Sequence, residues 1–247
     1  MREAVIVSAA RTPIGKAYRG AYNNTAAPTL ASYSIKEAVS RAGIDPEEVD
    51  DVVMGCAQQQ GSQALNIGRL GGIAAGLPNT VSGMTIDRQC SSGMMAIATA
   101  SKQIITDNMD TVVAGGVESI SLVQTAEIRL DIDTNVTENA QHAYMPMIET
   151  ADNVAEKYNV SREDQDEYSL QSQQRTAAAQ ESGIYADEVI STTTTKLVKD
   201  KESGEISEEE VTLEKDEGNR PETNLEGLSS LMPVYGEGKC ITAGNAS

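Results

Sequence analysis

Cys90 is the residue of this sequence whose setting is best suited to chemistry. It lies in the segment Thr85-Ile-Asp-Arg-Gln-Cys-Ser-Ser-Gly-Met, where a strand pattern leads through a tight junction into a helix pattern. A sulfur at the start of a helix faces free backbone N–H groups and the positive end of the helix dipole, and both favour the thiolate. Because the thiolate is the nucleophilic form of cysteine, this position predicts nucleophilic catalysis. The alternative is a small core residue at a strand end, since free cysteines are among the most buried residue types.

The other two thiols and the single histidine have weaker settings. Cys56 follows a short strand pattern and Cys240 precedes the run Ile-Thr-Ala-Gly, so both are expected to be packed thiols. His142 lies in a polar stretch and is expected at the surface. Three cysteines and one histidine fit neither a zinc site nor a closed disulfide framework, so no metal site is predicted.

The elements that must position Cys90 alternate between strands and helices. Short apolar runs typical of buried strands occupy residues 4–8, 51–54, 81–86 and 111–114. Apolar residues at helical spacing occupy 29–42, 66–75 and 91–105, and Asp45-Pro46 marks a further helix start. The helix after Cys90 has so little polar surface near its start that we expect it to be buried. This alternation predicts an α/β fold with a mixed, mainly parallel sheet and helices on both faces.

The second half of the chain has a less regular pattern. Residues 161–183 predict one long polar helix, which Ser161 begins as a cap with Asp164 three positions on. Residues 189–198 are rich in Thr and Val and predict a strand. Residues 216–232 predict irregular polar chain, and the acidic stretch 201–210 predicts a solvated hairpin or loop. We place the boundary between the two halves near residues 119–124.

Charge separates the same two halves and excludes several classes of function. The chain carries 37 acidic and 19 basic residues, a net charge of −18. Residues 1–120 hold 11 acidic and 9 basic groups, and residues 121–247 hold 26 and 10. Such an acidic chain is not attracted to nucleic acid or to anionic membranes, and without Trp or Phe it offers few surfaces for base stacking. The first apolar run is too short for a signal peptide or a membrane span, so a cytoplasmic location is expected.

Five separated motifs give the sequence a family resemblance. They are Ser8-Ala-Ala-Arg-Thr-Pro-Ile-Gly, Asp87-Arg-Gln-Cys-Ser-Ser-Gly, Ala114-Gly-Gly-Val-Glu-Ser, Pro146-Met-Ile-Glu-Thr-Ala-Asp-Asn-Val-Ala and Thr242-Ala-Gly-Asn-Ala-Ser. In order and spacing they resemble the thiolase family over essentially the whole chain. The resemblance implies a thiolase-like α/β fold, made of one βαβ-type core half with an α+β loop-domain insertion. It divides the chain into an incomplete N-terminal core (1–120), a loop domain covering coenzyme A (121–240) and a segment returning to the core (241–247).

The resemblance also implies a reaction and a set of site residues. Thiolases make or break the C–C bond next to a thioester carbonyl, with coenzyme A and acyl-CoA as substrates and no permanently bound cofactor. Cys90 matches the nucleophile that carries the acyl group as a thioester. Arg220 matches the loop-domain arginine that contacts the nucleotide end of coenzyme A. The remaining matches are to positions that contact or line the path of pantetheine: Ser247, Ala243, Met147 and Tyr235.

Two details bear on the substrate. Short-chain acetoacetyl members of the family carry His-Met where this sequence has Pro146-Met147. The segment around Cys90 is closer to degradative 3-ketoacyl-CoA members. These details favour cleavage of 3-ketoacyl-CoA of broad chain length, in fatty acid β-oxidation. An acetoacetyl-CoA-specific acetyltransferase is the alternative.

The sequence ends inside the Gly-Asn-Ala-Ser motif, whereas family members continue with further core strands and a second half of similar fold. That region carries an Asn-Glu-Ala-Phe motif, the histidine of Gly-His-Pro and the cysteine of Cys-Ile-Gly-Gly, none of which occurs here. We therefore expect an open sheet edge, an exposed apolar face and no activity without a complementary C-terminal half, in cis or in trans. A homodimer or tetramer is also expected. The alternatives are a non-catalytic CoA-binding or scaffold remnant and, with less support, a ketoacyl-synthase-type condensing enzyme.

Overall fold

The computed structural model describes residues 2–125 and 131–246, and these form two compact units. The first unit contains the described residues up to 125 together with Tyr185–Gly218. The second contains the described residues of Arg129–Ile184 and of Asn219–Ser247.

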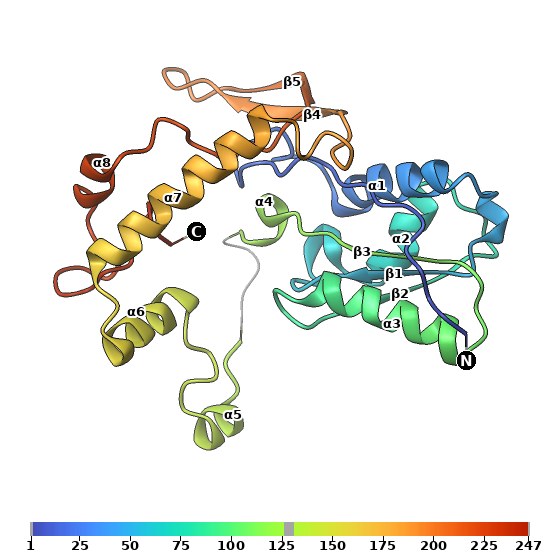
Figure 1. Ribbon diagram of the computed structural model, residues 1–247, viewed down its shortest axis with the longest axis horizontal. Coiled ribbons are helices and arrows are strands. Elements are labelled where there is room, and N and C mark those ends of the chain that lie inside the picture. Colours follow the sequence, from blue (N-terminus) through green and yellow to red (C-terminus); the bar gives the residue numbers. More distant parts are fainter. Residues whose placement is uncertain (1, 126–130, 247) are drawn as a thin grey trace. The chain divides into compact units, whose positions relative to one another are not determined.

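A parallel sheet forms the centre of the first unit. It consists of β1 (Asp51–Gly55), β2 (Ser82–Ile86) and β3 (Val112–Gly116), in the order β2-β1-β3 (Figure 1). Both strand pairs are parallel and in register along all five residues, with Asp51 opposite Ser82 and Val112. The carboxyl ends of the three strands therefore lie along one edge of the sheet, and the residues that follow them are neighbours.

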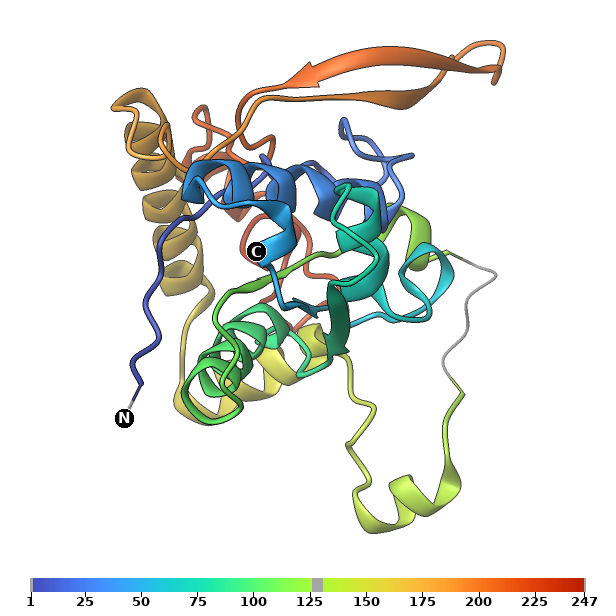
Figure 2. The same ribbon diagram turned by 90° about the vertical axis from the view of Figure 1, so that its right-hand side faces the viewer.

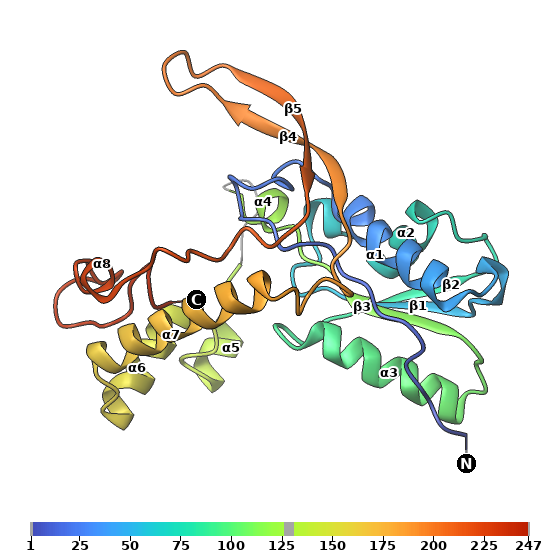
Figure 3. The same cartoon turned by 45° about the horizontal axis from the view of Figure 1, so that its top comes forward.

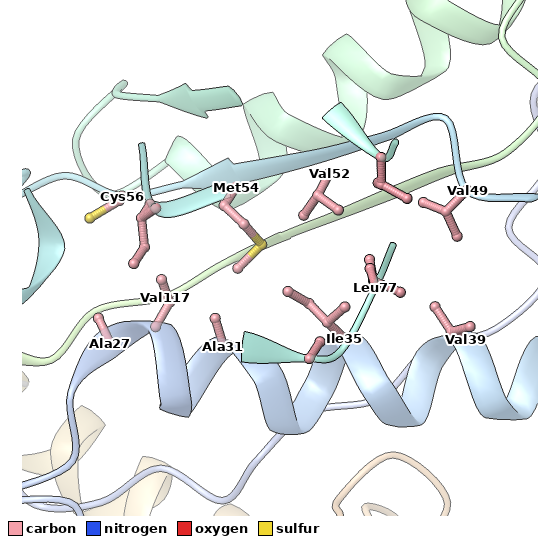
Figure 4. Close-up of a cluster of buried hydrophobic side chains, with 13 residues drawn as sticks. Ala27, Ala31, Ile35, Val39, Val49, Val52, Met54, Cys56, Leu77 and Val117 are labelled. Carbon is pink, nitrogen blue, oxygen red and sulfur yellow. The ribbon is translucent and has the colours of Figure 1, made fainter. Parts of the chain in front are cut away.

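Helices cover both faces of this sheet, as the sequence predicts. Helices α1 (Ala27–Ala42) and α2 (Ile67–Ala74) lie on one face and α3 (Ser92–Thr106) on the other (Figures 1 and 3). The side chains of β1 alternate accordingly. Val52 and Met54 enter the larger core with Ile35 and Val39 of α1 (Figure 4), whereas Val53 packs against Ala96 and Ala100 of α3. Since Val52 and Val53 are both fully buried, β1 is the central strand of the core.

Local sequence signals explain where the helices begin and end. Gly43 adopts the left-handed conformation that ends α1, and the Asn66 side chain accepts a hydrogen bond from Arg69 N at the start of α2. Asp45 caps a short 3₁₀ turn, η1 (Pro46–Glu48). The three predicted helices of this half are confirmed, with bounds that differ by one or two residues. This half also contains two short helical elements, η2 (Gly61–Gln63) and α4 (Ile120–Val123).

Two expectations for the first unit are wrong in this structure. Residues 4–8 form no strand, and Val5, Ile6 and Val7 are 71%, 80% and 71% exposed. An apolar run forms a strand only where a neighbouring backbone pairs with it, and no described strand does so here. Helix α3 is buried only along one face, because the exposed fraction is 76% for Met94 and 45% for Ile97. Composition alone does not reveal which face of an apolar helix has a neighbour.

A long antiparallel hairpin also belongs to the first unit. It consists of β4 (Thr192–Lys199) and β5 (Ile206–Leu213) and is drawn in orange in Figure 2. This arrangement confirms the strand expected at 189–198 and the solvated hairpin expected at 201–210. The Asn23 side-chain amide pairs with both backbone groups of Leu197, each at 2.9 Å, and attaches the hairpin to the rest of the unit. The loop domain predicted for 121–240 stays a prediction, although the hairpin within it belongs to the first compact unit.

Four helices make up most of the second unit. They are α5 (Thr134–Asn139), α6 (Met147–Tyr158), α7 (Arg162–Glu181) and α8 (Leu225–Ser229). Helix α7 confirms the long helix predicted from 161, and Ser161 and Asp164 form the expected reciprocal cap. Helices α5, α6 and α8 are not predicted, and α8 interrupts the stretch expected to be irregular. Within the described part of the chain, every helix is either too short or too polar to cross a bilayer.

Candidate active site

Cys90 lies in a five-residue loop, 87–91, between the end of β2 and the start of α3. We call these residues the cysteine loop. The thiol is exposed, so Cys90 is not the buried core residue of the alternative interpretation. Gln89, immediately before it, has φ of 48°, a left-handed backbone that non-glycine residues seldom adopt. The chain thus turns sharply just before the cysteine, and the helix starts two residues after it.

Short polar side chains hold this sharp turn. The Asp87 carboxylate accepts a hydrogen bond from Gln89 N at 2.8 Å. The Ser92 hydroxyl accepts from Arg88 N at 2.9 Å and donates to the Gln89 carbonyl oxygen at 2.6 Å. The loop is therefore pinned from both ends by its own sequence, which offsets the cost of the left-handed residue.

Glycines allow the first turn of α3 to lie directly on the strand ends. A Cβ atom on Gly55, the last residue of β1, would overlap the backbone of Ser92 and Gly93. A Cβ on Gly116, the last residue of β3, would lie 3.2 Å from Gly93 Cα. This close approach fixes the height of the helix start above the sheet, and with it the position of the cysteine loop.

The remaining thiols have the packed settings expected for them. Cys56 is 1% exposed, and burial raises its pKa to about 12, with a further contribution from the Glu118 carboxylate. Cys240 is half-buried in the second unit, and burial again raises its pKa. Its S–H group donates to Asp152 Oδ1 at 3.3 Å. Cys90 is thus the exposed thiol of the chain.

The structure groups four of the other predicted site residues in the second unit, namely Arg220, Met147, Tyr235 and Ala243. Met147 begins α6 and is 68% exposed, Tyr235 lies in the loop after α8 and is 48% exposed, and Ala243 is also exposed. Backbone pairing joins the segments that carry Tyr235 and Ala243, because Val234 N donates to the Ile241 carbonyl at 2.8 Å. Ser247 lies outside the described residues.

Two carboxylates on successive helices hold the segment that carries Ala243. Asp152 of α6 is 2% exposed, and its Oδ1 accepts from the backbone N–H groups of Cys240 and Ile241 at 3.0 and 3.2 Å. Asp166 of α7 accepts from the Asn245 side chain at 3.0 Å. Burial raises the pKa of Asp152, but the Cys240 and Ile241 donors outweigh it and leave the pKa below its ordinary value. The carboxylate therefore stays ionised and keeps the segment in place.

Arg220 is exposed near α7 in the same unit. Its backbone N–H donates to Gln173 Oε1 at 2.8 Å, and the neighbouring Asn219 side chain donates to the same glutamine. Over the residues that the structure describes, the Arg220 guanidinium forms no ion pair. The backbone is thus fixed while the cation stays available to an anionic ligand.

Sequence reasoning missed Glu118, Gln63 and Asp152 as residues that shape these sites. Glu118 stands two residues after the end of β3, inside the Gly-Gly-Val-Glu-Ser motif, and a charged residue at that end of a parallel strand is a recognisable signal. His142 is exposed in the second unit, as expected. In residues 2–125 and 131–246, no group of three or more His, Cys, Asp or Glu side chains could hold a metal ion.

Comparisons with known proteins agree on one family. The family described as "Thiolase, N-terminal domain" matches residues 4–247. The chain is 40% identical to a 3-ketoacyl-CoA thiolase of Bacillus subtilis and 40% identical to a beta-ketoadipyl-CoA thiolase of Pseudomonas aeruginosa. In each case 100% of this chain aligns with 63% of the relative. A peroxisomal 3-ketoacyl-CoA thiolase B of Mus musculus is 36% identical, over 99% of this chain and 57% of the relative.

A solved structure has the same fold. The crystal structure of the Bacillus anthracis acetyl-CoA acetyltransferase matches with a TM-score of 0.82 and 38% identity, over 100% of this chain and 62% of that one. The chain therefore spans less than two thirds of the length of these relatives.

Proposed function

Because the chain belongs to the thiolase family, we propose that it supplies the nucleophile-bearing part of an acyl-CoA C-acyltransferase. The observation that carries this proposal is the exposed thiol of Cys90 at the junction of β2 and α3, within a motif that matches the family's nucleophile. The start of a 15-residue helix favours negative charge at that point. Cys90 is thus suited to attack a carbonyl carbon.

The proposed reaction has two half-reactions that share one thioester. In the cleaving direction, the Cys90 sulfur bonds to the 3-keto carbon of a 3-ketoacyl-CoA, and the bond between C2 and C3 breaks. The two-carbon CoA fragment takes a proton and leaves as acetyl-CoA, while the shortened acyl group stays on Cys90. The thiol of a second coenzyme A then attacks this thioester, and the sulfur of Cys90 is released. Condensation of two acyl-CoA molecules is the reverse sequence.

We infer 3-ketoacyl-CoA of broad chain length as the substrate class. The names of the relatives from Bacillus subtilis and Mus musculus support this choice, and so does Pro146-Met147 in place of His-Met. The solved relative named an acetyl-CoA acetyltransferase keeps the acetoacetyl-CoA-specific alternative open.

Coenzyme A would bind as a substrate rather than as a resident cofactor. Arg220 is proposed to pair with its nucleotide phosphates, since a guanidinium without an ion-pair partner in the described structure can take a phosphate in two parallel hydrogen bonds. Ala243 and Ser247 would contact the pantetheine arm, and Met147 and Tyr235 would line its path.

Turnover requires groups beyond those seen here. An acid–base group typically contributes about 10²–10⁴-fold to such a reaction, and the one histidine of the sequence, His142, is exposed in the second unit, whereas Cys90 belongs to the first. We therefore propose that a C-terminal thiolase half, in cis or in trans, completes the site, and that the complete enzyme is a homodimer or tetramer. A cytoplasmic location suits three unpaired thiols.

Peptide-resolved mass spectrometry after incubation with acetyl-CoA tests the proposal. We expect an added acetyl group on the Cys90 peptide, no label on Cys56 or Cys240, and no label in a Cys90→Ser variant. If coenzyme A binds but Cys90 stays unmodified, the proposed acyltransferase activity is contradicted and a non-catalytic CoA-binding scaffold is favoured. The 247-residue chain alone is expected to show no thiolysis, and measurable turnover would make His142 the candidate base.

A further inference from the structure

Glu118 links the end of β3 to the turn that follows β1. It lies two residues beyond the end of β3 and is half-buried. Its Oε2 accepts a hydrogen bond from Ala57 N at 3.0 Å, and its Oε1 accepts from Gln58 N at 3.2 Å. Both donors belong to the turn that follows β1. One carboxylate from the end of β3 thus holds the residues that leave β1.

Gln63 completes this link from a fully buried position. Its Nε2 donates to Glu118 Oε1 and, at 2.7 Å, to the Gln58 carbonyl oxygen. Its Oε1 accepts from the backbone N–H of Ser119, the residue after Glu118. Both ends of the amide are therefore bonded, and the glutamine fixes the carboxylate in one orientation. We call Glu118, Gln63 and the backbone of Ala57 and Gln58 the strand-end link.

The strand-end link lies next to the support of the cysteine loop. Val117 N donates to the Gly55 carbonyl at 3.0 Å, one residue before Glu118. Gly55 and Gly116 are the two residues on which the start of α3 lies. Cys56 N donates to the Ile86 carbonyl at 3.0 Å, and Ile86 is the last residue before the cysteine loop. Any shift of residues 55–58 is therefore transmitted both to the base of α3 and to the end of β2.

We propose that Glu118 is a positioning residue for Cys90. It does not touch the sulfur; it fixes the two strand ends that set the height and direction of the cysteine loop. Acyl transfer depends on the placement of the attacking sulfur to within about 0.5 Å, whereas alkylation by a small free reagent depends mainly on exposure. This inference rests on the proposed acyl transfer only for its catalytic consequence, since the coupling between Glu118 and the loop is a property of the first unit itself.

Replacing Glu118 by Gln tests the link with almost no change in shape. The new amide nitrogen would face at least one of the N–H donors that the carboxylate accepts, so the turn after β1 loosens. Glu118→Asp keeps the charge on a shorter side chain, so its effect on this turn should lie between wild type and Glu118→Gln. Glu217→Gln is the matched control. That carboxylate also accepts backbone N–H groups in the first unit, from Lys16 and Ala21, and its hydrogen bonds in the described structure involve neither residues 55–58 nor residues 86–93.

The primary readout is hydrogen exchange at the amides of Ser91 and Ser92, which bond to the Arg88 and Gln89 carbonyls. We expect exchange there to rise about tenfold in Glu118→Gln and less in Glu118→Asp, with no change in Glu217→Gln. The second readout compares two rates at Cys90. Acetylation by acetyl-CoA should fall about tenfold or more in Glu118→Gln, while alkylation by iodoacetamide changes less than about twofold.

The outcomes separate this inference from the proposed function. If wild-type Cys90 takes no acetyl group, the proposed function fails, and the exchange data still decide the role of Glu118. Unchanged exchange at Ser91 and Ser92 in Glu118→Gln, or an equal rise in Glu217→Gln, would overturn the inference. If Glu118→Gln does not fold, Glu118→Asp decides alone, by whether Ser91 and Ser92 exchange faster than in Glu217→Gln.

Discussion

Gly55, the last residue of β1, lies against the backbone of Ser92, the first residue of α3, so closely that no side chain fits between them. This contact joins the central strand of the first unit to the helix that follows Cys90. The position of the cysteine loop therefore requires a residue without a side chain at position 55.

The first prediction concerns this contact. Gly55→Ala should destabilise the first unit by about 1–3 kcal/mol and displace the cysteine loop, because its methyl group overlaps backbone that cannot rotate away. Gly115→Ala is the matched control. It lies next to Gly116 in β3, and its Cβ would meet only Met54 Sδ at 3.8 Å, an ordinary contact. Urea unfolding of both variants, followed by circular dichroism, checks the prediction, and equal stability of the two would refute it.

The second prediction concerns the reactivity of the thiols. With a pKa of about 12, only about one Cys56 thiol in 10⁴ is ionised at pH 8, and the side chain is 1% exposed. We expect iodoacetamide to modify the exposed Cys90 more than about a hundredfold faster than Cys56 in the folded chain. A time course resolved by peptide mass spectrometry measures both rates. The same experiment in 8 M urea is the control, where the two rates should converge to within about threefold because burial is lost.

The local pattern predicts the centre of the first unit and the place of Cys90 well. Asn66, Gly43 and Ser161 act at helix ends as their residue types dictate, and the apolar runs of β1, β2 and β3 pair as parallel strands. The helix ends depend on neighbours within a few residues along the chain, and the parallel pairing follows from the alternation of strand and helix patterns. The pattern therefore carries enough information to predict them.

Features that depend on distant neighbours are not predictable in this way. The apolar run at 4–8 looks like a strand, yet no described strand pairs with it. The role of Glu118 depends on residues about 60 positions earlier. The role of Asp152 in α6 is also not predictable from the local pattern, because this carboxylate accepts a hydrogen bond from the backbone 88 positions later. Spacing along the chain gives no measure of such contacts, which follow only from the packing of the elements.

The third prediction is a dependence of stability on pH through Asp216. Arg11 forms two hydrogen bonds to this carboxylate, at 2.7 and 3.1 Å, and Ile14 N donates to it at 2.8 Å. Burial raises the pKa of Asp216, but the Arg11 and Ile14 donors outweigh it and leave the pKa below its ordinary value. The stabilisation is therefore fully present above the unfolded pKa of about 4 and is lost as the pH falls through the lower folded value.

Asp216→Asn should remove this pH dependence. We expect it to lower the free energy of unfolding at pH 7 by about 1–2 kcal/mol, a figure reduced for the partial exposure of Arg11. The difference from wild type should shrink as the pH falls below about 4, because the carboxylate is then protonated first in the unfolded chain and, at still lower pH, in the folded one. Urea titrations at pH 7 and pH 3 measure it. A difference that is the same at both pH values would show that charge is not the cause.

The fourth prediction concerns coenzyme A. Arg220→Gln should weaken binding of coenzyme A about tenfold, the loss of roughly 1.4 kcal/mol expected when a charged hydrogen-bond donor to phosphate is replaced by a neutral one. Arg175→Gln is the control, since Arg175 is an exposed arginine on α7 of the same unit. Isothermal titration calorimetry gives both dissociation constants. Equal affinity in the two variants would leave Arg220 without the proposed role.

The last prediction concerns the segment that carries Ala243. Asp152→Ala leaves the backbone N–H groups of Cys240 and Ile241 without their acceptor, at a cost of about 1–3 kcal/mol in the second unit. Hydrogen exchange at these two amides should accelerate, because their only acceptor among the described residues is this carboxylate. Binding of coenzyme A should weaken as well if the segment contacts pantetheine. Glu149→Ala, an exposed carboxylate on the same helix, should change neither quantity. If the Cys240 and Ile241 amides exchange faster but coenzyme A binds equally well, the contact with Asp152 is confirmed and the segment does not belong to the coenzyme A site.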